Sequence, residues 1–208
     1  MISRDKLLGA AARVYAEAGF RGSTTRRIAD EAGLNEVTIF RLFGSKAALL
    51  AEAVRHSAAA GVAHLLPPEP VDPERELSAW ASVQLDFLRA HVSLIRKSLA
   101  DIEELPGMGT QACEGCLQGR TDLRRYARKL CERWGTTRAV DLDAAVAMLI
   151  GAIMSDAIAR EVMPAGFPEP AQRAAAAYAR VFLRAIGKPA PAAPGGAKAR
   201  VRRPANKS

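Results

Sequence analysis

The chain has 208 residues, a net charge of +8 and 49% hydrophobic residues. A chain of this length forms one compact domain or two small ones, and its hydrophobic share, which is close to the average of globular proteins, excludes bulk disorder. Aromatic residues make up only 5% while alanine is abundant. This balance favours helices over sheets, so we predict an all-α protein of about nine helices.

The cysteines and the N-terminus indicate the compartment. Cys113 and Cys116 lie too close together, and the three cysteines are too few, to form a disulfide scaffold. The first residues lack the apolar segment of a signal peptide, and we find no apolar run of the roughly 18 residues that would span a bilayer. We therefore expect a cytoplasmic protein without a membrane partner.

Charge is concentrated at the two ends of the chain. Residues 1–64 carry a net charge of +3, residues 65–187 carry −1 and residues 188–208 carry +6. Basic ends around a neutral body suggest binding to a polyanion, although a merely soluble basic protein would show the same charge. We divide the chain at these borders into an N-terminal domain, a helical body and a disordered basic tail. The tail would either attract DNA without sequence preference or simply aid solubility.

The N-terminal domain begins with a helix whose apolar stripe runs from Leu7 to Ala18 and which Gly19 can end as a left-handed cap. Two short helices follow. Thr24 or Thr25 is placed to cap a helix over 26–32, which Gly33 ends, and Asn35 is placed to cap a helix over 36–43. Two short helices joined by a tight, glycine-containing turn form a helix-turn-helix unit.

The second of these short helices has one face suited to DNA. Projection at about 100° per residue turns Ile39 and Phe43 towards the core, and leaves Val37, Thr38 and Arg41 facing outward, with Leu42 between the two faces. Arginine can pair with guanine in the major groove, and apolar groups can meet a thymine methyl. Ser45 would cap the next helix, predicted over 46–66, and Lys46 in its first turn would bind a phosphate.

Prolines between positions 67 and 73 separate the N-terminal domain from the body, and further breaks fall at 106–109, 135–137 and 164–170. Two long apolar helices, over 140–163 and 171–186, close the body. Leucine and isoleucine next to small residues allow close packing, so we expect these helices to form a two-fold dimer interface. The interface residues that we predict are Leu149, Ile153, Ala157, Tyr178 and Phe182.

Residues 24–33 and 38–50, with the preceding helix, resemble the N-terminal DNA-binding domain of TetR-type transcriptional regulators. The resemblance implies a homodimeric repressor whose body binds a small ligand and whose last two helices form a four-helix interface. It implies DNA contacts for the matching Thr25, Thr38, Phe40, Arg41 and Lys46. Three positions depart from the family: Phe40 is commonly tyrosine, Leu42 stands where histidine is common, and Val37 replaces a small residue.

Taken together, the residues from which we expect DNA contacts are Thr24, Thr25, Asn35, Val37, Thr38, Phe40, Arg41 and Lys46. A ligand cavity in the body would be mostly apolar with a few polar groups. The side chains that could form one are Trp80, Phe87, His91, Met108, Trp134 and Met148. Each of them could instead be an ordinary core residue.

Enzymatic function is not expected, because the chain lacks nucleophile-elbow, phosphate-loop, zinc-protease and dinucleotide motifs. We expect no cofactor and no metal. Cys113 and Cys116 could form a redox switch or half a metal site, or be ordinary thiols, because no second pair accompanies them. We predict a repressor that binds a palindromic DNA operator as a dimer and is released by a small molecule of unknown identity. The alternative is a helical adaptor that binds only protein.

Overall fold

The computed structural model describes residues 4–60, 66–103, 114–137 and 139–188 of the chain, and within them it contains nine α-helices, two short 3-10 helices and no strand. The predicted all-α class is therefore confirmed. The elements are α1 (Arg4–Gly22), α2 (Thr25–Ala32), α3 (Glu36–Phe43), α4 (Lys46–Ala60), α5 (Pro73–Ala90), α6 (Val92–Ala100), α8 (Glu114–Trp134), α9 (Leu142–Ala159), η2 (Pro164–Gly166), η3 (Ala171–Arg173) and α10 (Ala174–Ala185). Of the expected tail, residues 188–208, all but Lys188 lie outside this description, and the Lys188 side chain is bonded to Glu74 of α5.

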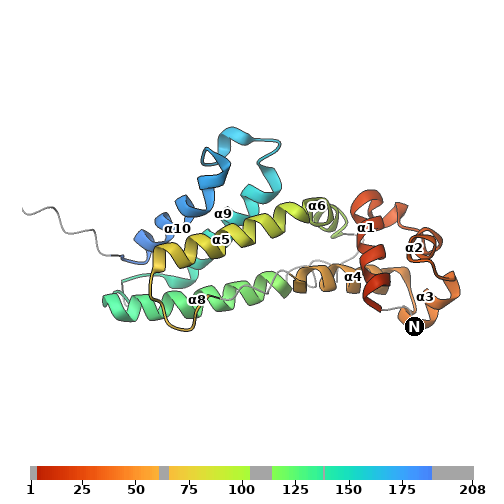
Figure 1. The fold of residues 1–208 in the computed structure, drawn as a ribbon, viewed down its shortest axis with the longest axis horizontal. Helices are drawn as coiled ribbons and strands as arrows, with labels where there is room; N and C mark the ends of the chain where they lie inside the picture. Colours follow the sequence, from red (N-terminus) through yellow and green to blue (C-terminus); the bar gives the residue numbers. More distant parts are fainter. Residues whose placement is uncertain (1–3, 61–65, 104–113, 138, 189–208) are drawn as a thin grey trace, which may run out of the picture.

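The helices form two groups, each with its own buried core. Helices α1 to α4 gather at one end of the molecule, and α5, α8, α9 and α10 form the body, with α6 beside α1 (Figure 1). Leu94 of α6 is buried in the N-terminal core with residues of α1 to α4. The second core begins at Leu66 and continues through the body to Ile186. Helix α6 therefore belongs to the body by sequence and to the N-terminal core by packing.

The end of α1 differs from the sequence expectation. Gly19 has φ 66° and ψ −174°, so it kinks the helix instead of ending it in the left-handed conformation, and another turn continues to Gly22. The carbonyl oxygen of Gly19 accepts hydrogen bonds from both the backbone N–H and the hydroxyl of the buried Ser23. The positive φ explains the glycine, because other residues adopt this conformation only at an energetic cost.

Helix α9 is the most apolar long helix in the described part of the chain, although Asp143 and Asp156 interrupt its apolar sequence. Its residues Leu142–Ala159 are long and apolar enough to cross a bilayer by length and composition alone, with a mean hydropathy of 1.8. In the structure this helix packs against α5, α8 and α10, as the core helix of a folded body does. It is shorter than the predicted span 140–163 and begins after Asp141, whose side chain accepts a hydrogen bond from the N–H of Ala144.

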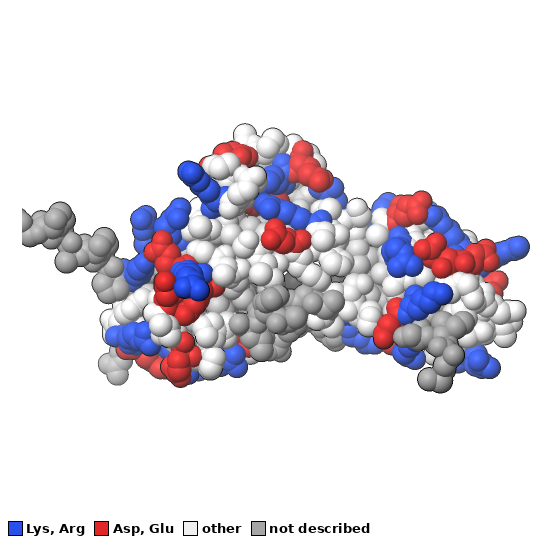
Figure 2. Space-filling view, viewed as in Figure 1, with Lys and Arg blue, Asp and Glu red and all other residues white. Residues whose placement is uncertain are grey.

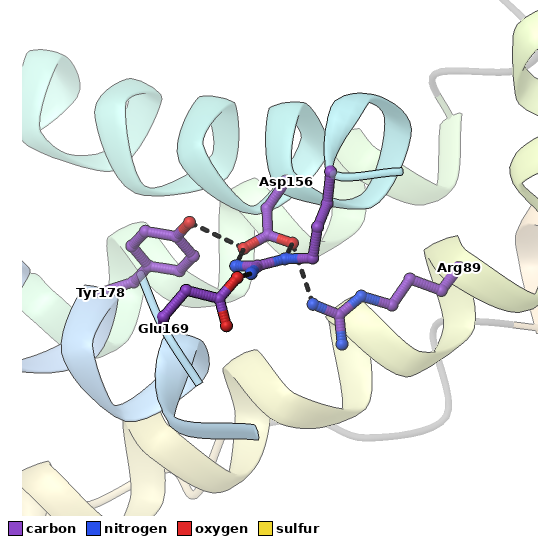
Figure 3. A network of polar contacts seen from close by, with 5 residues as sticks. Arg89, Asp156, Glu169 and Tyr178 are labelled. Atoms are coloured by element: carbon purple, nitrogen blue, oxygen red, sulfur yellow. Dashed lines mark hydrogen bonds and ion pairs between the residues drawn. The ribbon is translucent and has the colours of Figure 1, made fainter. Parts of the chain in front are cut away.

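A buried carboxylate joins three helices of the body. Asp156 of α9 is 0% exposed and accepts hydrogen bonds from Arg89 of α5 at 2.9 Å and from the Tyr178 hydroxyl of α10 at 2.8 Å (Figure 3). Arg160, the residue that follows the end of α9, binds both carboxylate oxygens and also Glu169. Burial would raise the pKa of Asp156, but the hydrogen bonds from Arg160, Arg89 and Tyr178 outweigh it and lower this pKa to about 2.

Candidate nucleic-acid interface

The two short helices end and begin where the sequence predicts. Thr24 caps α2, with its hydroxyl accepting the N–H of Arg27 at 3.2 Å. Gly33 ends α2 in the left-handed conformation, with φ 68° and ψ 42°. Asn35 caps α3 by accepting the N–H of Val37 at 2.9 Å, and Ser45 accepts the N–H of Ala48 at the start of α4. These caps satisfy backbone donors that helix ends otherwise leave unpaired.

Helix α3 presents one face to the core and one to solvent. Ile39 is fully buried, and Phe43 packs against the same N-terminal cluster. On the other face Val37 is 71% exposed, Phe40 48% and Leu42 46%. This face also carries Arg41, which is exposed, and Thr38, which is half-buried. The predicted division of the helix into an inward and an outward face is therefore what the structure contains, with Leu42 on the exposed side.

Two arginines of this domain carry free guanidinium groups. Arg41 of α3 and Arg26 of α2 are exposed and have no ionic or hydrogen-bonding partner in the described part of the chain. Other arginines of the domain form ion pairs with acidic residues, namely Arg4 with Glu52, Arg13 with Glu31 and Arg27 with Glu17. Acidic and basic side chains are accordingly interspersed on the face of this domain in Figure 2. Sequence reasoning did not single out Arg26, which follows Thr25 in the first turn of α2.

The hydroxyl of Thr25 is already engaged within the domain. It donates a hydrogen bond to the Glu36 carboxylate at the start of α3, at 2.5 Å. This contact ties the first turn of α2 to the first turn of α3 and directs the only acidic side chain of α3 towards α2. Thr25 is half-buried, so its contribution in the structure is to hold the two helices together.

Lys46 lies against the end of α1. Its ammonium group donates a hydrogen bond to the carbonyl oxygen of Phe20 at 2.8 Å and sits 3.9 Å from the centre of the Phe20 ring. The backbone N–H of Phe20 donates a hydrogen bond to the carboxylate of Asp101, which follows α6, at 2.9 Å. The backbone carbonyl and the backbone N–H of Phe20 are therefore each bonded to a side chain, the first to Lys46 of α4 and the second to Asp101 of the body.

Neither Phe20 nor Asp101 was identified from the sequence, because 81 residues separate the two partners. Nearby, the hydroxyl of the buried Tyr15 has no hydrogen-bond partner in the described residues. Burial and the neighbouring Asp101 carboxylate raise the pKa of Tyr15, so this group stays neutral at physiological pH. The contact region between α1 and α6 therefore contains the half-buried side chain of Asp101 and the buried hydroxyl of Tyr15.

The residues predicted to line a ligand cavity are not brought together around one described cavity. Trp80 is buried in the body core, and Phe87 and Trp134 pack against that core. Met148 is 71% exposed, so its assignment to a cavity is wrong. Its position on α9 turns it away from the body, and Met108 lies outside the described residues.

His91 alone among these residues lines a described hollow, of about 340 Å³, between the N-terminal domain and the body. The hollow is lined on the α1 side by the small residues Gly9, Ala12 and Ala16 and by Arg13. The imidazole stacks against the Phe87 ring at 4.3 Å, and its Nδ1 lies 2.8 Å from the Phe87 carbonyl oxygen. The histidine is therefore held in place mainly by its own helix.

The residues predicted for the dimer interface lie mostly inside the single chain. The side chains of Leu149, Ile153, Ala157 and Phe182 are buried in the body core, so they have little surface left to give to a second copy. Tyr178 is half-buried and bonded to Asp156. The assignment of the four buried residues to an interface is therefore corrected, because their side chains fill the body core, in which α9 packs against α5 and α8 and α10 packs against α5 and α9.

Among the residues that the structure describes, no group of three or more histidine, cysteine, aspartate or glutamate side chains is placed to hold a metal ion. Cys113 lies outside the described residues. Cys116 belongs to α8, but its side chain is not described. The remaining cysteine, Cys131, is a free and buried thiol.

Comparison with known proteins agrees with this geometry. Residues 7–53, which run from α1 into α4, match the family of bacterial regulatory proteins called the tetR family. Over 93 residues the chain is 33% identical to the HTH-type transcriptional repressor AcnR of Corynebacterium efficiens and 34% identical to AcnR of Corynebacterium glutamicum. Each match covers 41% of this chain, and it spans about half the length of the curated relative, 48% in both cases.

Solved structures resemble a larger part of the chain. One from Pseudomonas aeruginosa has a TM-score of 0.73 at 19% identity and covers 86% of this chain and 87% of its own. A transcriptional regulator from Rhodococcus has a TM-score of 0.70 at 22% identity, covering 88% and 97%. The TetR family transcriptional regulator PfmR from Thermus thermophilus has a TM-score of 0.63 at 22% identity, covering 88% and 98%. At these identities the likeness shows that the fold is shared.

Proposed function

We propose that this chain, whose residues 7–53 match the tetR family of bacterial regulatory proteins, is a DNA-binding transcriptional repressor that acts in the cytoplasm. It binds a palindromic operator as a dimer and is released from it by a small molecule. The observation that carries the proposal is the outward face of α3, on which the unpaired guanidinium group of Arg41 stands between exposed side chains.

The size and chemistry of α3 suit the major groove. A single helix fits this groove, and a bidentate arginine contact to guanine is the commonest specific contact there. Arg41 is available for such a contact because no carboxylate in the described part of the chain binds it. Arg26 is equally free and lies in the first turn of α2, where a cation would contact a phosphate of the backbone.

Support for a dimer comes from the outer face of α9, not from its inner face. Ala147, Met148, Gly151 and Ser155 are exposed and follow one another at helical spacing along this face. A Cβ at Gly151 would meet nothing within 4 Å, so a second helix can approach closely there. Val181 is 62% exposed on α10. To reach two half-sites of a palindromic operator, such a dimer has to hold its two copies of α3 about 34–36 Å apart, one turn of B-DNA, or further if the body spreads them.

Release by a small molecule requires that the body and α3 be mechanically connected. Phe20 and Asp101 connect α1 to α6, and α4 packs against α8. Some ligands would prefer an arrangement of the body in which the two α3 helices no longer match the groove. Such a ligand would weaken DNA binding by the same free energy by which DNA weakens ligand binding, typically about 1–3 kcal/mol. Operator affinity that stays unchanged across a broad ligand screen would count against this part of the proposal.

The experiment that tests the proposal is binding-site selection from random duplexes with the full chain, at two salt concentrations. We expect enrichment of a two-fold symmetric sequence, and weaker binding at the higher salt concentration because phosphate contacts release counterions. Arg41→Ala should lose the enrichment. Arg128→Ala, which removes an exposed arginine of α8, should keep it. If the chain is a protein-binding adaptor, neither the wild type nor Arg41→Ala nor Arg128→Ala should enrich any duplex sequence.

A further inference from the structure

We infer that α3 reads thymine methyl groups, with Val37 as the side chain that contacts the methyl and Arg41 as the side chain that contacts a guanine one or two base pairs away. This inference rests on the proposed function, and it adds which chemical feature of the DNA determines the operator. It follows from three properties of α3: its exposed apolar side chains, their order around the helix, and the charges beside them.

The first property is the concentration of apolar surface on a very short helix. Val37, Phe40 and Leu42 are all large, and each is at least 46% exposed, although α3 has only eight residues. Single exposed apolar residues are normal on a protein surface, but a group of them marks a binding site. In the major groove every base edge offers polar atoms except for one apolar group, the C5 methyl of thymine. An apolar recognition surface in this groove therefore favours thymine.

The second property is the order of the side chains around the helix. At about 100° per residue, Arg41 lies at the centre of the exposed arc with Val37 about 40° to one side. Phe40 and Leu42 lie about 100° away on opposite sides, where they would face the walls of the groove. Val37 is therefore the apolar side chain best placed to reach the floor of the groove. Four residues of helix advance by about 6 Å, which is close to two base-pair steps of about 3.4 Å.

The third property is charge, and it favours a duplex over a protein as the occupant of this surface. The only acidic residue of α3, Glu36, is bound by the hydroxyl of Thr25 on α2. The unpaired cations on α2 and α3 are Arg26 and Arg41 in the described part of the chain. These two arginines lie next to the apolar side chains of α3. They therefore complement a DNA duplex, in which phosphates flank the methyl group of a thymine.

The test uses the full chain and the duplex obtained by selection. Each thymine of a half-site is replaced in turn by deoxyuridine, which removes only the methyl group, and binding is measured by fluorescence anisotropy. Removing the contacted methyl should weaken binding of the wild type about fourfold per half-site, the effect of losing one buried methyl-sized group. In a variant site with C·G at that position, 5-methylcytosine should bind more tightly than unmodified cytosine, because this pair of duplexes again differs only in the methyl group.

Variants assign the contact to a residue. Val37→Ala should bind the thymine and deoxyuridine duplexes equally at that position, while keeping its preference for the guanine. Val71→Ala is the matched control, because it shortens a valine that is 83% exposed in the body, and it should keep the full methyl effect. Both side chains are exposed, so neither variant should unfold the protein.

The outcomes separate this inference from the proposed function. Sequence-specific binding that is indifferent to every thymine methyl, or that keeps its methyl dependence in Val37→Ala, overturns the inference and leaves the proposed function standing. If selection yields no preferred duplex, the proposed function fails and the inference fails with it. Both would also fail if the α3 face bound a protein specifically and showed no preference among duplexes.

Discussion

The ammonium group of Lys46 and the carbonyl oxygen of Phe20 are 2.8 Å apart, so the first residue of α4 is bonded to the last turn of α1. An ammonium group has three N–H donors, and this contact uses one of them. The other two remain able to bind a phosphate. Lys46 therefore has a structural contact in the protein and a predicted contact with DNA, and a simple loss of binding on mutation would not separate the two.

The salt dependence of DNA binding distinguishes these two roles of Lys46. Each phosphate contact contributes about 0.9 to the slope of log affinity against log salt. We expect Lys46→Met, which keeps most of the aliphatic chain, to reduce the magnitude of this slope by about 1.8 for a dimer. Phe20→Leu removes the ring under the ammonium group but keeps the charge, and should leave the slope unchanged. An unchanged slope in Lys46→Met would mean that the residue acts only within the protein.

The bond between Asp101 and the Phe20 N–H predicts that Asp101→Ala lowers operator affinity although this residue is far from α3. A hydrogen bond to a charged group contributes about 1.5–3 kcal/mol, and its loss frees the last turn of α1, on which Lys46 also rests. Asp101→Asn keeps an oxygen acceptor and should retain most of the affinity. Amide hydrogen exchange reports the cause directly, since the Phe20 amide should lose protection in the alanine variant. Protection that persists would refute this account of Asp101.

Asp156 predicts a large loss of stability when its charge is removed. Leaving Arg89 and Arg160 without their buried partner costs about 3–5 kcal/mol, as for other broken buried ion pairs, so Asp156→Ala should unfold at a much lower denaturant concentration. Tyr178→Phe removes one neutral donor to the same carboxylate and should cost only about 1 kcal/mol. Equal losses in the two variants would contradict the network as the structure places it.

The same carboxylate predicts how stability varies at acid pH. The pKa of Asp156 in the folded chain is about 2, below its ordinary value of 3.8. A lowered folded pKa means that Asp156 contributes stability above about pH 4 and loses it as the pH falls through about 2. Urea denaturation of Asp156→Asn should therefore show a flatter pH dependence than the wild type in this window. A steeper dependence in the variant would reverse the sign that the geometry requires.

The outer face of α9 predicts the effect of mutations on assembly. Met148→Arg places a charge at the centre of the proposed interface, and sedimentation should show mainly monomers that remain helical and fully folded. Val71→Arg adds the same charge at an exposed valine of the body and should leave the dimer intact. A Met148→Arg dimer with wild-type affinity would show that α9 does not form the interface. Ile153 is unsuitable for this test, because a charge there would disrupt the core.

Local signals in the sequence predicted much of the N-terminal domain. The caps at Thr24 and Asn35 and the left-handed Gly33 depend on a few consecutive residues, so their chemistry is readable without the rest of the fold. The inward side of α3 was equally readable, because only Ile39 and Phe43 combine large apolar side chains with the spacing of one face. These elements account for the exposed position of Arg41.

Contacts between distant segments could not be predicted in the same way. Phe20 and Asp101 share no local pattern, and the partners of Asp156 come from α5 and α10 as well as from α9. The interface residues failed for another reason. Helix α9 is apolar on nearly all sides, so its periodicity does not show which face meets the core. Leu149 and Met148 are neighbours in sequence, yet the first is buried and the second exposed.

If α3 enters the major groove, Arg41 on its outward face selects the DNA sequence that the protein binds. This selection is measured by the ratio of affinities for the selected duplex and a scrambled duplex, for the wild type, Arg41→Ala and Arg128→Ala. Losing a bidentate contact to guanine costs about 1–3 kcal/mol per half-site. We therefore predict that this ratio falls about fivefold to 150-fold per half-site in Arg41→Ala and stays unchanged in Arg128→Ala. An Arg41→Ala protein with the wild-type ratio would contradict the account.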